Sequence, residues 1–168
     1  MPADIIETHP HLPFIPTNAT VLILGSFPGR HHLQADAKTE WFYGAPRNQF
    51  WPIIRGVYNE ALLTPGDKKN CFEKHGIAIT DIFLKIRRKE NNNADSSIEV
   101  VEYNDKVLGH IFNNYDFKTV FFTSHFVEKE FKKLFPAIKN TETLPSPSPR
   151  YAKMSLSEKI IHYKNKLP

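Results

Sequence analysis

A chain of 168 residues, of which 40% are hydrophobic and 24% charged, has the composition of an ordinary globular protein and the length for one sizeable core. Its single cysteine excludes an intrachain disulfide and a four-cysteine metal or iron–sulfur site. The formal net charge of +4 favours acidic partners only slightly, because many basic proteins bind no polyanion. The sequence shows neither a signal-peptide pattern nor an apolar segment of membrane-spanning length, so we expect a cytoplasmic protein with no membrane partner.

We expect one domain over residues 1–168, in which residues 1–18 form an irregular segment, because they are rich in proline and histidine and follow no clear period. His9 and His11 lie in this segment. No cluster of further ligands accompanies them, so we expect them at the surface and predict no metal site.

The run Val21–Leu24 predicts a buried strand, because it is apolar, too short for a helix and followed by the turn-forming sequence GSFPG at residues 25–29. Ligands of open α/β sheets bind beyond the carboxyl ends of the strands, where this turn lies. Gly25 and Gly29 let the backbone approach a ligand closely, and Pro28 stiffens the loop between them.

Aromatic residues crowd the next segment, residues 41–46, and they are too many for all of them to be buried in so short a loop. A helix is predicted from Asn48, because asparagine is a favourable N-cap and apolar side chains then recur at nearly helical spacing, at Phe50, Trp51, Ile54, Val57 and Tyr58. A short helix around Cys71 and Phe72 follows. Cys71 and His75 lie four residues apart but lack other ligands, so we expect a structural role for both.

Three further apolar runs predict strands, at Gly76–Leu84, Thr119–Thr123 and Thr141–Leu144. The charged and asparagine-rich residues 85–93 predict a loop, whose cluster Lys85–Lys89 either follows DNA or forms a solvated face. A helix is predicted after them, because Ser96 and Glu99 have the spacing of a capping box and apolar residues then mark one helical face, at Val107, Leu108, Ile111 and Phe112.

Two more helices complete the chain. Residues 125–135 are amphipathic, and Ser155 with Glu158 forms a second capping box before the basic segment Leu156–Lys166. Strands that alternate with helices predict a parallel sheet covered on both faces. The sequence therefore predicts an α/β fold, a three-layer α/β/α sandwich around a central four-stranded parallel sheet.

The predicted strand ends carry small polar groups, and the aromatic segment joins them. Neither a G-x-S-x-G elbow, nor a glycine-rich phosphate loop, nor a spacing typical of metal ligands occurs. Aromatic faces, an amide or carboxylate, and serine hydroxyls suit a pocket for a flat heterocycle attached to a phosphate backbone.

Three motifs occur in order: GSFPG at residues 25–29, PRNQFW at 46–51 and LPSPSP at 144–149. Together they resemble the uracil-DNA glycosylase superfamily, and within it the hypoxanthine-DNA glycosylase family, whose pattern runs G-S-x-P-G, R-N-x-F-W and L-P-S-x-S-P. The similarity extends to the strand with Asp81 and to NADSSI at 93–98, so it covers most of the chain from Val21 onward.

The resemblance implies a uracil-DNA glycosylase-like fold and a monomeric DNA-repair glycosylase without a cofactor. Such an enzyme flips a deaminated base, uracil or hypoxanthine, out of DNA and hydrolyses its N-glycosidic bond to leave an abasic site. The uracil enzymes of this superfamily carry an aspartate in the first motif, which orients water. Here Ser26 and Phe27 occupy that motif, so a catalytic polar group must come from elsewhere.

By resemblance, Asn48 is the catalytic residue, and its amide can orient water or donate to the base; the alternative is a helix N-cap. Asp81 matches a base-contacting position, although a cap or a salt bridge to Lys85–Lys89 is also consistent with the sequence. The base-binding set is completed by a stacking wall and gate, for which Phe27 has a core alternative; its members are Ser26, Phe27, Phe42 and Tyr43.

The resemblance also implies a set of DNA-binding residues. Its members are Pro28, Gly29, Ser124, His125, Ser146, Ser148, Arg150 and Tyr151. The proline–serine run is alternatively a stiff connector, and His125 is alternatively the start of a helix. Arg150 departs from the family pattern, and it either fills the gap in the duplex or binds phosphate.

Two other functions stay open at this point. A superfamily member without catalysis would only bind nucleic acid or a nucleobase. An unrelated α/β hydrolase would need a nucleophile–base pair, and the adjacent Ser124 and His125 have the wrong geometry for one.

Overall fold

The computed structural model describes residues 5–34, 36 and 40–168, so residues 1–4 of the expected N-terminal segment lie outside the described residues. Its centre is a sheet of order β3-β2-β6-β7 in which each neighbouring pair is parallel. The strands are β2 (Val21–Gly25), β3 (Ile77–Asp81), β6 (Thr119–Phe122) and β7 (Thr141–Thr143). The predicted α/β class and the four-stranded parallel sheet are confirmed.

The two faces of this sheet belong to two separate cores. In β2, Val21 and Ile23 contribute to one hydrophobic cluster, whereas Leu22 and Leu24 contribute to the other. Successive side chains of a strand point to opposite faces, and a strand buried on both faces therefore appears in the sequence as a continuous apolar run. This is why the run at 21–24 carried a clear strand signal.

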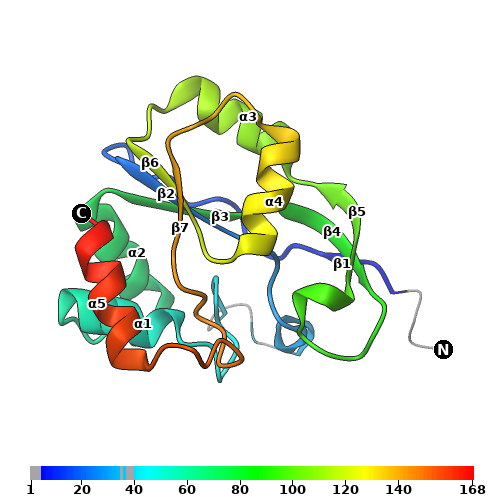
Figure 1. Ribbon diagram of the computed structural model, residues 1–168, viewed down its shortest axis with the longest axis horizontal. Coiled ribbons are helices and arrows are strands. Elements are labelled where there is room, and N and C mark those ends of the chain that lie inside the picture. Colours follow the sequence, from blue (N-terminus) through cyan, green and yellow to red (C-terminus); the bar gives the residue numbers. More distant parts are fainter. Residues whose placement is uncertain (1–4, 35, 37–39) are drawn as a thin grey trace.

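Helices cover both faces (Figure 1). The first cluster packs against α1 (Phe50–Tyr58), α2 (Pro65–His75) and α5 (Leu156–Lys166), and the second against α3 (Asp105–Asn114) and α4 (His125–Leu134). The capping box at Ser155 and Glu158 forms as predicted. None of the helices within the described residues is long and apolar enough to cross a membrane.

A second, antiparallel sheet of order β1-β4-β5 was not expected. It consists of β1 (Glu7–Thr8), β4 (Phe83–Arg88) and β5 (Ile98–Tyr103). The predicted loop at 85–93 is therefore wrong over its first residues, and the predicted helix start at Ser96 and Glu99 is wrong too. Ser96 lies in the short 3-10 helix η3 (Asp95–Ser97), and Glu99 lies in β5.

The charged cluster of β4 was mistaken for a loop because the carboxylates that neutralise it lie on other strands, with Glu102 beside Lys85, Glu99 beside Arg87 and Glu7 beside Arg88. Arg88 donates from Nε to Glu7 Oε1 at 2.9 Å, and the side chains of both residues are less than 5% exposed. Burial of a charge costs free energy unless it is paired and hydrogen-bonded, and this pair meets that condition. The pair fixes the N-terminal strand β1 on β4.

Candidate active site

The carboxyl ends of β2, β3 and β6 open into a cavity of about 770 Å³. Its walls come from the loop after β2, the loop before α1, the β4–β5 connection and the proline–serine run after β7. All but two of the sequence-predicted site residues line it. They are Ser26, Phe27, Pro28, Gly29, Tyr43, Asn48, Asp81, Ser124, Ser146, Ser148, Arg150 and Tyr151.

Phe42 and His125 are the two that do not line the cavity. Phe42 is fully buried between the rings of His9, His11 and Trp41. It is therefore a core residue, and the expected base-binding role of Phe42 is wrong. The His125 side chain is 86% exposed and pairs through Nδ1 with Glu128 Oε2 at 2.9 Å, one turn along α4. Its position as the first residue of α4 matches the helix-start alternative.

Tyr43 is held rigidly at the cavity wall. Its φ of 56° is in the left-handed region, its ring stacks on Phe50 at 4.0 Å, and its hydroxyl bonds to Thr123 Oγ1 at 3.0 Å. Burial raises the pKa of Tyr43 well above its usual value, so the phenol stays neutral. A left-handed tyrosine costs about 1–3 kcal/mol, which the stack and the hydrogen bond must offset.

Asp81 lies at the end of β3 with 5% of its surface exposed, and its partner is a surprise. His9 Nε2 is 2.7 Å from Asp81 Oδ2, and the His9 side chain is only 5% exposed. The expected surface position of His9 is therefore wrong. Its neighbour His11 is also largely buried, at 11% exposure. Neither of the alternatives weighed for Asp81, a cap or a bridge to the lysine cluster, is present in the described residues.

Asn48 has one of its two expected settings, because it lines the cavity but is not the N-cap of α1, which is Gln49. It lines the cavity, and its Oδ1 accepts a hydrogen bond from the backbone N–H of Phe50 at 2.9 Å, at the start of α1. The amide oxygen is thereby engaged, which leaves the NH2 group to donate. The bond to Phe50 N–H is thus compatible with a role of Asn48 in the cavity.

The proline–serine run forms a compact loop rather than an extended connector. Ser148 N–H donates to Ser146 Oγ and Arg150 N–H donates to Ser148 Oγ, each at 3.2 Å. Gln49 N–H donates to Pro147 O at 2.8 Å, which joins this loop to the residue next to Asn48.

Lys159, a residue that the sequence did not single out, lies beneath this loop. It projects from α5, is 1% exposed, and donates from Nζ to Gln49 Oε1 at 2.7 Å and to Ser148 O at 3.2 Å. It belongs to the predicted basic segment Leu156–Lys166, in which no sequence signal separates a buried lysine from a solvated one.

Phe27 has both of its expected settings. It lines the cavity, and its ring also packs edge-on against His9 at 5.3 Å and His32 at 5.5 Å. Beside it, Ser26 Oγ–H donates to Asp95 Oδ1 at 3.2 Å. Asp95 lines the cavity and was not predicted as a site residue, although it lies within the NADSSI segment.

Cys71 and His75 have a third neighbour, Glu60, and one donor atom from each lies within 4.8 Å of the others. Lys74 Nζ already bonds to Glu60 Oε1 at 3.1 Å, so a cation neutralises that carboxylate. None of the three lines the cavity.

A family model described as the uracil DNA glycosylase superfamily matches residues 12–167. The chain belongs to this superfamily. Its three motifs lie on three of the cavity walls, because each follows or precedes an element that ends at the same edge of the parallel sheet.

Two individual proteins show similarity to this chain. The hypoxanthine DNA glycosylase of Methanosarcina barkeri is 30% identical over 94 residues, which are 55% of this chain and 56% of the relative, so the match spans about half of that curated protein. The solution NMR structure of a candidate uracil DNA glycosylase from Methanosarcina acetivorans superposes with a TM-score of 0.73 at 23% identity and covers 96% of this chain and 98% of the other. This second likeness establishes the shared fold.

Proposed function

We propose that this protein is a monofunctional DNA N-glycosylase. It flips a deaminated base, uracil or hypoxanthine, out of DNA and hydrolyses the N-glycosidic bond to leave an abasic site. It acts as a cytoplasmic monomer, with damaged DNA as its partner and without a cofactor. The proposal is supported by membership of the superfamily and by the similarity to the M. barkeri hypoxanthine DNA glycosylase over about half of that relative.

The observation that carries the proposal is the meeting of Asn48, Asp81 and Tyr43 in one cavity. A volume of about 770 Å³ lies in the range of small-molecule sites, which is roughly 300–1,000 Å³. The cavity offers an aromatic face, an amide donor and a carboxylate acceptor, and these are the groups that recognise the face and edge of a flipped base.

Departure of a base leaves negative charge on its ring and positive charge on the sugar. The NH2 group of Asn48 donates to a carbonyl oxygen of the base, where that negative charge develops. A donor fixed before the reaction costs no reorganisation in the transition state. The Phe50 N–H bond supplies this fixation, because it holds the amide oxygen in place.

Asp81 accepts a hydrogen bond from a ring or exocyclic N–H of the base, and its bond to His9 holds the carboxylate in place. Tyr43 presents the stacking face. The Ser146–Tyr151 loop and Ser124, which caps α4 through its hydroxyl, bind the phosphates beside the flipped nucleotide.

An inactive member that only binds nucleic acid is the second candidate. The first motif favours it, because Ser26 and Phe27 bring no carboxylate to the place where other members carry their aspartate. Turnover separates the two candidates.

The test uses labelled oligonucleotides with one uracil, hypoxanthine, xanthine or mismatched thymine each, as single and double strands, with alkaline cleavage at abasic sites. We expect excision of uracil or hypoxanthine. Asn48→Ala should lower the single-turnover rate about 10²–10³-fold, the usual cost of one lost transition-state donor, and leave the Kd for DNA nearly unchanged. Binding without excision of any lesion would establish the second candidate.

Asn48→Asp is the matched control, because aspartate keeps the oxygen that accepts from Phe50 N–H but lacks the NH2 donor. Both variants should be slow if the donor matters. A fast Asn48→Asp enzyme would show that only the bond to Phe50 N–H is required.

A further inference from the structure

We propose that the carboxylate of Asp95 positions the water that attacks the sugar, an inference that rests on the glycosylase function proposed above. Asp95 comes from η3, between β4 and β5, and not from the motif in which other members of the superfamily carry an aspartate. It would supply from a neighbouring hairpin the group that the first motif lacks.

Two carboxylates of the described residues are available in the cavity to position a water. Hydrolysis through a cationic sugar needs an oriented water and benefits from a negative charge beside the developing cation. Asp81 and Asp95 are the acidic side chains among the cavity-lining residues, within the part of the chain that the structure describes. A carboxylate that positions water in this cavity is therefore Asp81 or Asp95.

Asp81 is already engaged on both sides. Its Oδ2 bonds to His9 at 2.7 Å, and its Oδ1 is so close to Gly25 that a Cβ there would be 2.5 Å away. Tyr43 crowds the same point, with its hydroxyl 2.2 Å from that Cβ position. A carboxylate so confined can contact a flat base edge, but a water has little room beside it.

Asp95 has one described partner and a free oxygen. Its Oδ1 accepts from Ser26 Oγ–H at 3.2 Å, and no further hydrogen bond to its carboxylate is found among the residues described. The Ser26 hydroxyl thus orients the carboxylate, and the second oxygen can accept from a water in the cavity. The serine of the first motif has a positioning role in this scheme.

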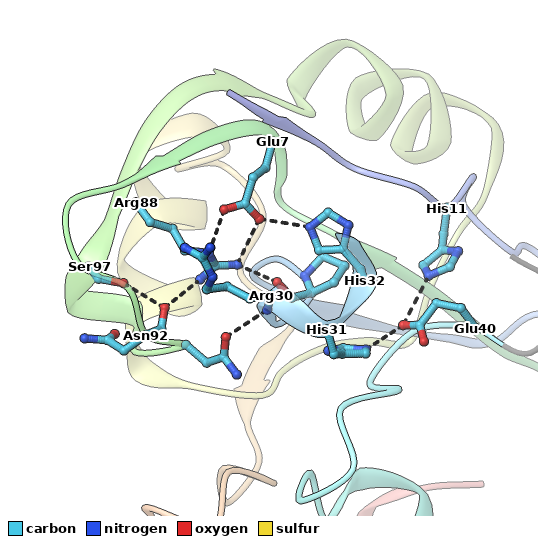
Figure 2. Close-up of polar contacts among 11 residues, drawn as sticks. Glu7, His11, Arg30, His31, His32, Glu40, Arg88, Asn92 and Ser97 are labelled. Carbon is cyan, nitrogen blue, oxygen red and sulfur yellow. Dashed lines mark hydrogen bonds and ion pairs between the residues drawn. The ribbon is translucent and has the colours of Figure 1, made fainter. Parts of the chain in front are cut away.

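A polar network holds the hairpin that carries Asp95 against the first-motif loop (Figure 2). Arg88 donates to Glu7 and, from Nη2, to Pro28 O at 2.7 Å. Asn93 Oδ1 accepts from the backbone N–H of Arg30 at 2.8 Å. Two bonds from the segment that precedes Asp95 therefore connect its hairpin to residues 28–30, and such support is what a catalytic carboxylate requires.

The electrostatic setting agrees with this role. Burial raises the pKa of the Asp95 carboxyl, against the opposing effects of the Ser26 hydrogen bond and the Arg88 charge. A higher proton affinity than that of a surface aspartate makes the carboxylate a better acceptor for a proton of water.

The step balances as a hydrolysis. The C1′–N bond breaks and its electron pair leaves with the base, while the water oxygen forms the new C1′–O bond. One proton of that water passes to the Asp95 carboxylate. It is then released to solvent, and the departed base takes up a proton from solvent, so the net change is the addition of one water.

Asp95→Asn tests the inference, because it keeps the shape and the Ser26 contact but removes the charge. We expect the single-turnover excision rate to fall about 10²-fold or more, the usual contribution of a general base. The Kd for DNA with a non-hydrolysable analogue should stay the same or decrease, because a negative charge near phosphates is lost. Asp116→Asn, the same change at an exposed loop position, is the control and should match wild type.

A second variant makes the test specific. In Asp95→Ala, added formate should restore part of the rate, since a small carboxylate can occupy the emptied space; a purely structural residue gives no such rescue. Ser26→Ala removes the hydrogen bond that orients Asp95 and should lower the rate less than Asp95→Asn does. This variant tests the inference if the hairpin of Asp95→Asn fails to fold.

Two results would overturn the inference alone: a wild-type rate in folded Asp95→Asn, or loss of hydrolysis in Asp81→Asn with no loss in Asp95→Asn. Absence of excision by the wild-type protein on every lesion would instead overturn the proposed function, and the inference with it.

Discussion

Gly25 ends β2 at a point where no larger side chain fits. A Cβ there would lie 2.2 Å from the Tyr43 hydroxyl and 2.5 Å from Asp81 Oδ1, and neither group can move easily. The tyrosine is fixed by Phe50 and Thr123, and the aspartate by His9. The glycine therefore allows the proposed stacking face and the base-edge carboxylate to lie side by side.

We expect Gly25→Ala to displace one of these two groups. Overpacking costs about 1–3 kcal/mol in the free energy of unfolding, and a catalytic group moved by about 1 Å costs about 10²-fold in rate. Urea denaturation and single-turnover excision measure the two effects.

Gly109→Ala is the matched control with the opposite sign. Gly109 lies within α3, and a Cβ there meets nothing within 4 Å. Alanine is favoured over glycine in a helix by about 1 kcal/mol, so this variant should be more stable and equally active. Equal behaviour of the two variants would refute the steric argument.

At the scale of elements, α5 ties together the two loops that carry Asn48 and the serines. Lys159 binds Gln49 and Ser148, and Tyr163, one turn later, donates to Pro145 O at 2.8 Å. No acidic side chain within the described residues pairs with Lys159, so its charge has no counter-ion there.

Lys159→Met should leave the free energy of unfolding within about 1 kcal/mol of wild type. Two hydrogen bonds are lost, but the cost of burying an unpaired charge is removed as well. DNA affinity should fall, and the slope of log K against log salt should decrease by about 0.9 if the charge faces a phosphate. DNA-binding titrations at several salt concentrations measure both the affinity and this slope. Lys164→Met, an exposed change on the same helix, is the control; identical slopes in both variants would contradict the expectation.

The central sheet was predictable because its strands are buried on both faces, as the run at 21–24 shows. The β4–β5 hairpin was not predictable in this way. Arg88 can be buried in it only because Glu7, a partner 81 positions away, neutralises its charge. Ser96 and Glu99 imitate a capping box, but the residues that follow alternate between outward and partly buried positions along β5.

The same distinction applies to the site. Ser146, Ser148 and Asn48 could be grouped from the sequence, because motif loops at the ends of parallel strands meet at one edge. Phe42 and Tyr43 could not be told apart, since a loop has no period that separates inward from outward rings. His9 and Asp95 were missed as site residues because their partners, Asp81 and Ser26, are 72 and 69 residues away.

At the scale of the whole molecule, the N-terminal segment joins the two sheets. Glu7 pairs with Ile86 of β4, and Phe14 forms an antiparallel bridge with Ile79 of β3, so the segment follows one continuous edge. Between these points His9 and His11 are buried, beside His31 and His32 of the short helix η2 (Arg30–Leu33). Figure 2 shows His11 and His31 turned toward Glu40, and His32 toward Glu7.

This arrangement makes the fold sensitive to acid. Burial, and then the charge of His9, lower the pKa of His11 from 6.5 to about 4, and burial lowers the pKa of His32 as well. Below pH 6.5 these histidines bind protons in the unfolded chain but remain largely unprotonated in the folded one. The free energy of unfolding therefore decreases as the pH falls toward 4. For His11 alone the shift corresponds to about 3 kcal/mol at roughly 1.36 kcal/mol per unit.

His11→Gln removes this titration while it keeps a polar side chain of similar size. The variant should lose less stability than wild type between pH 6.5 and 4, by about 1–3 kcal/mol, as measured by urea denaturation at each pH. His110→Gln, at an exposed position of α3, is the control and should leave the wild-type profile unchanged. If the His11→Gln profile ran parallel to that of wild type, the acid sensitivity would have to come from another group, and His32 would be the next to replace.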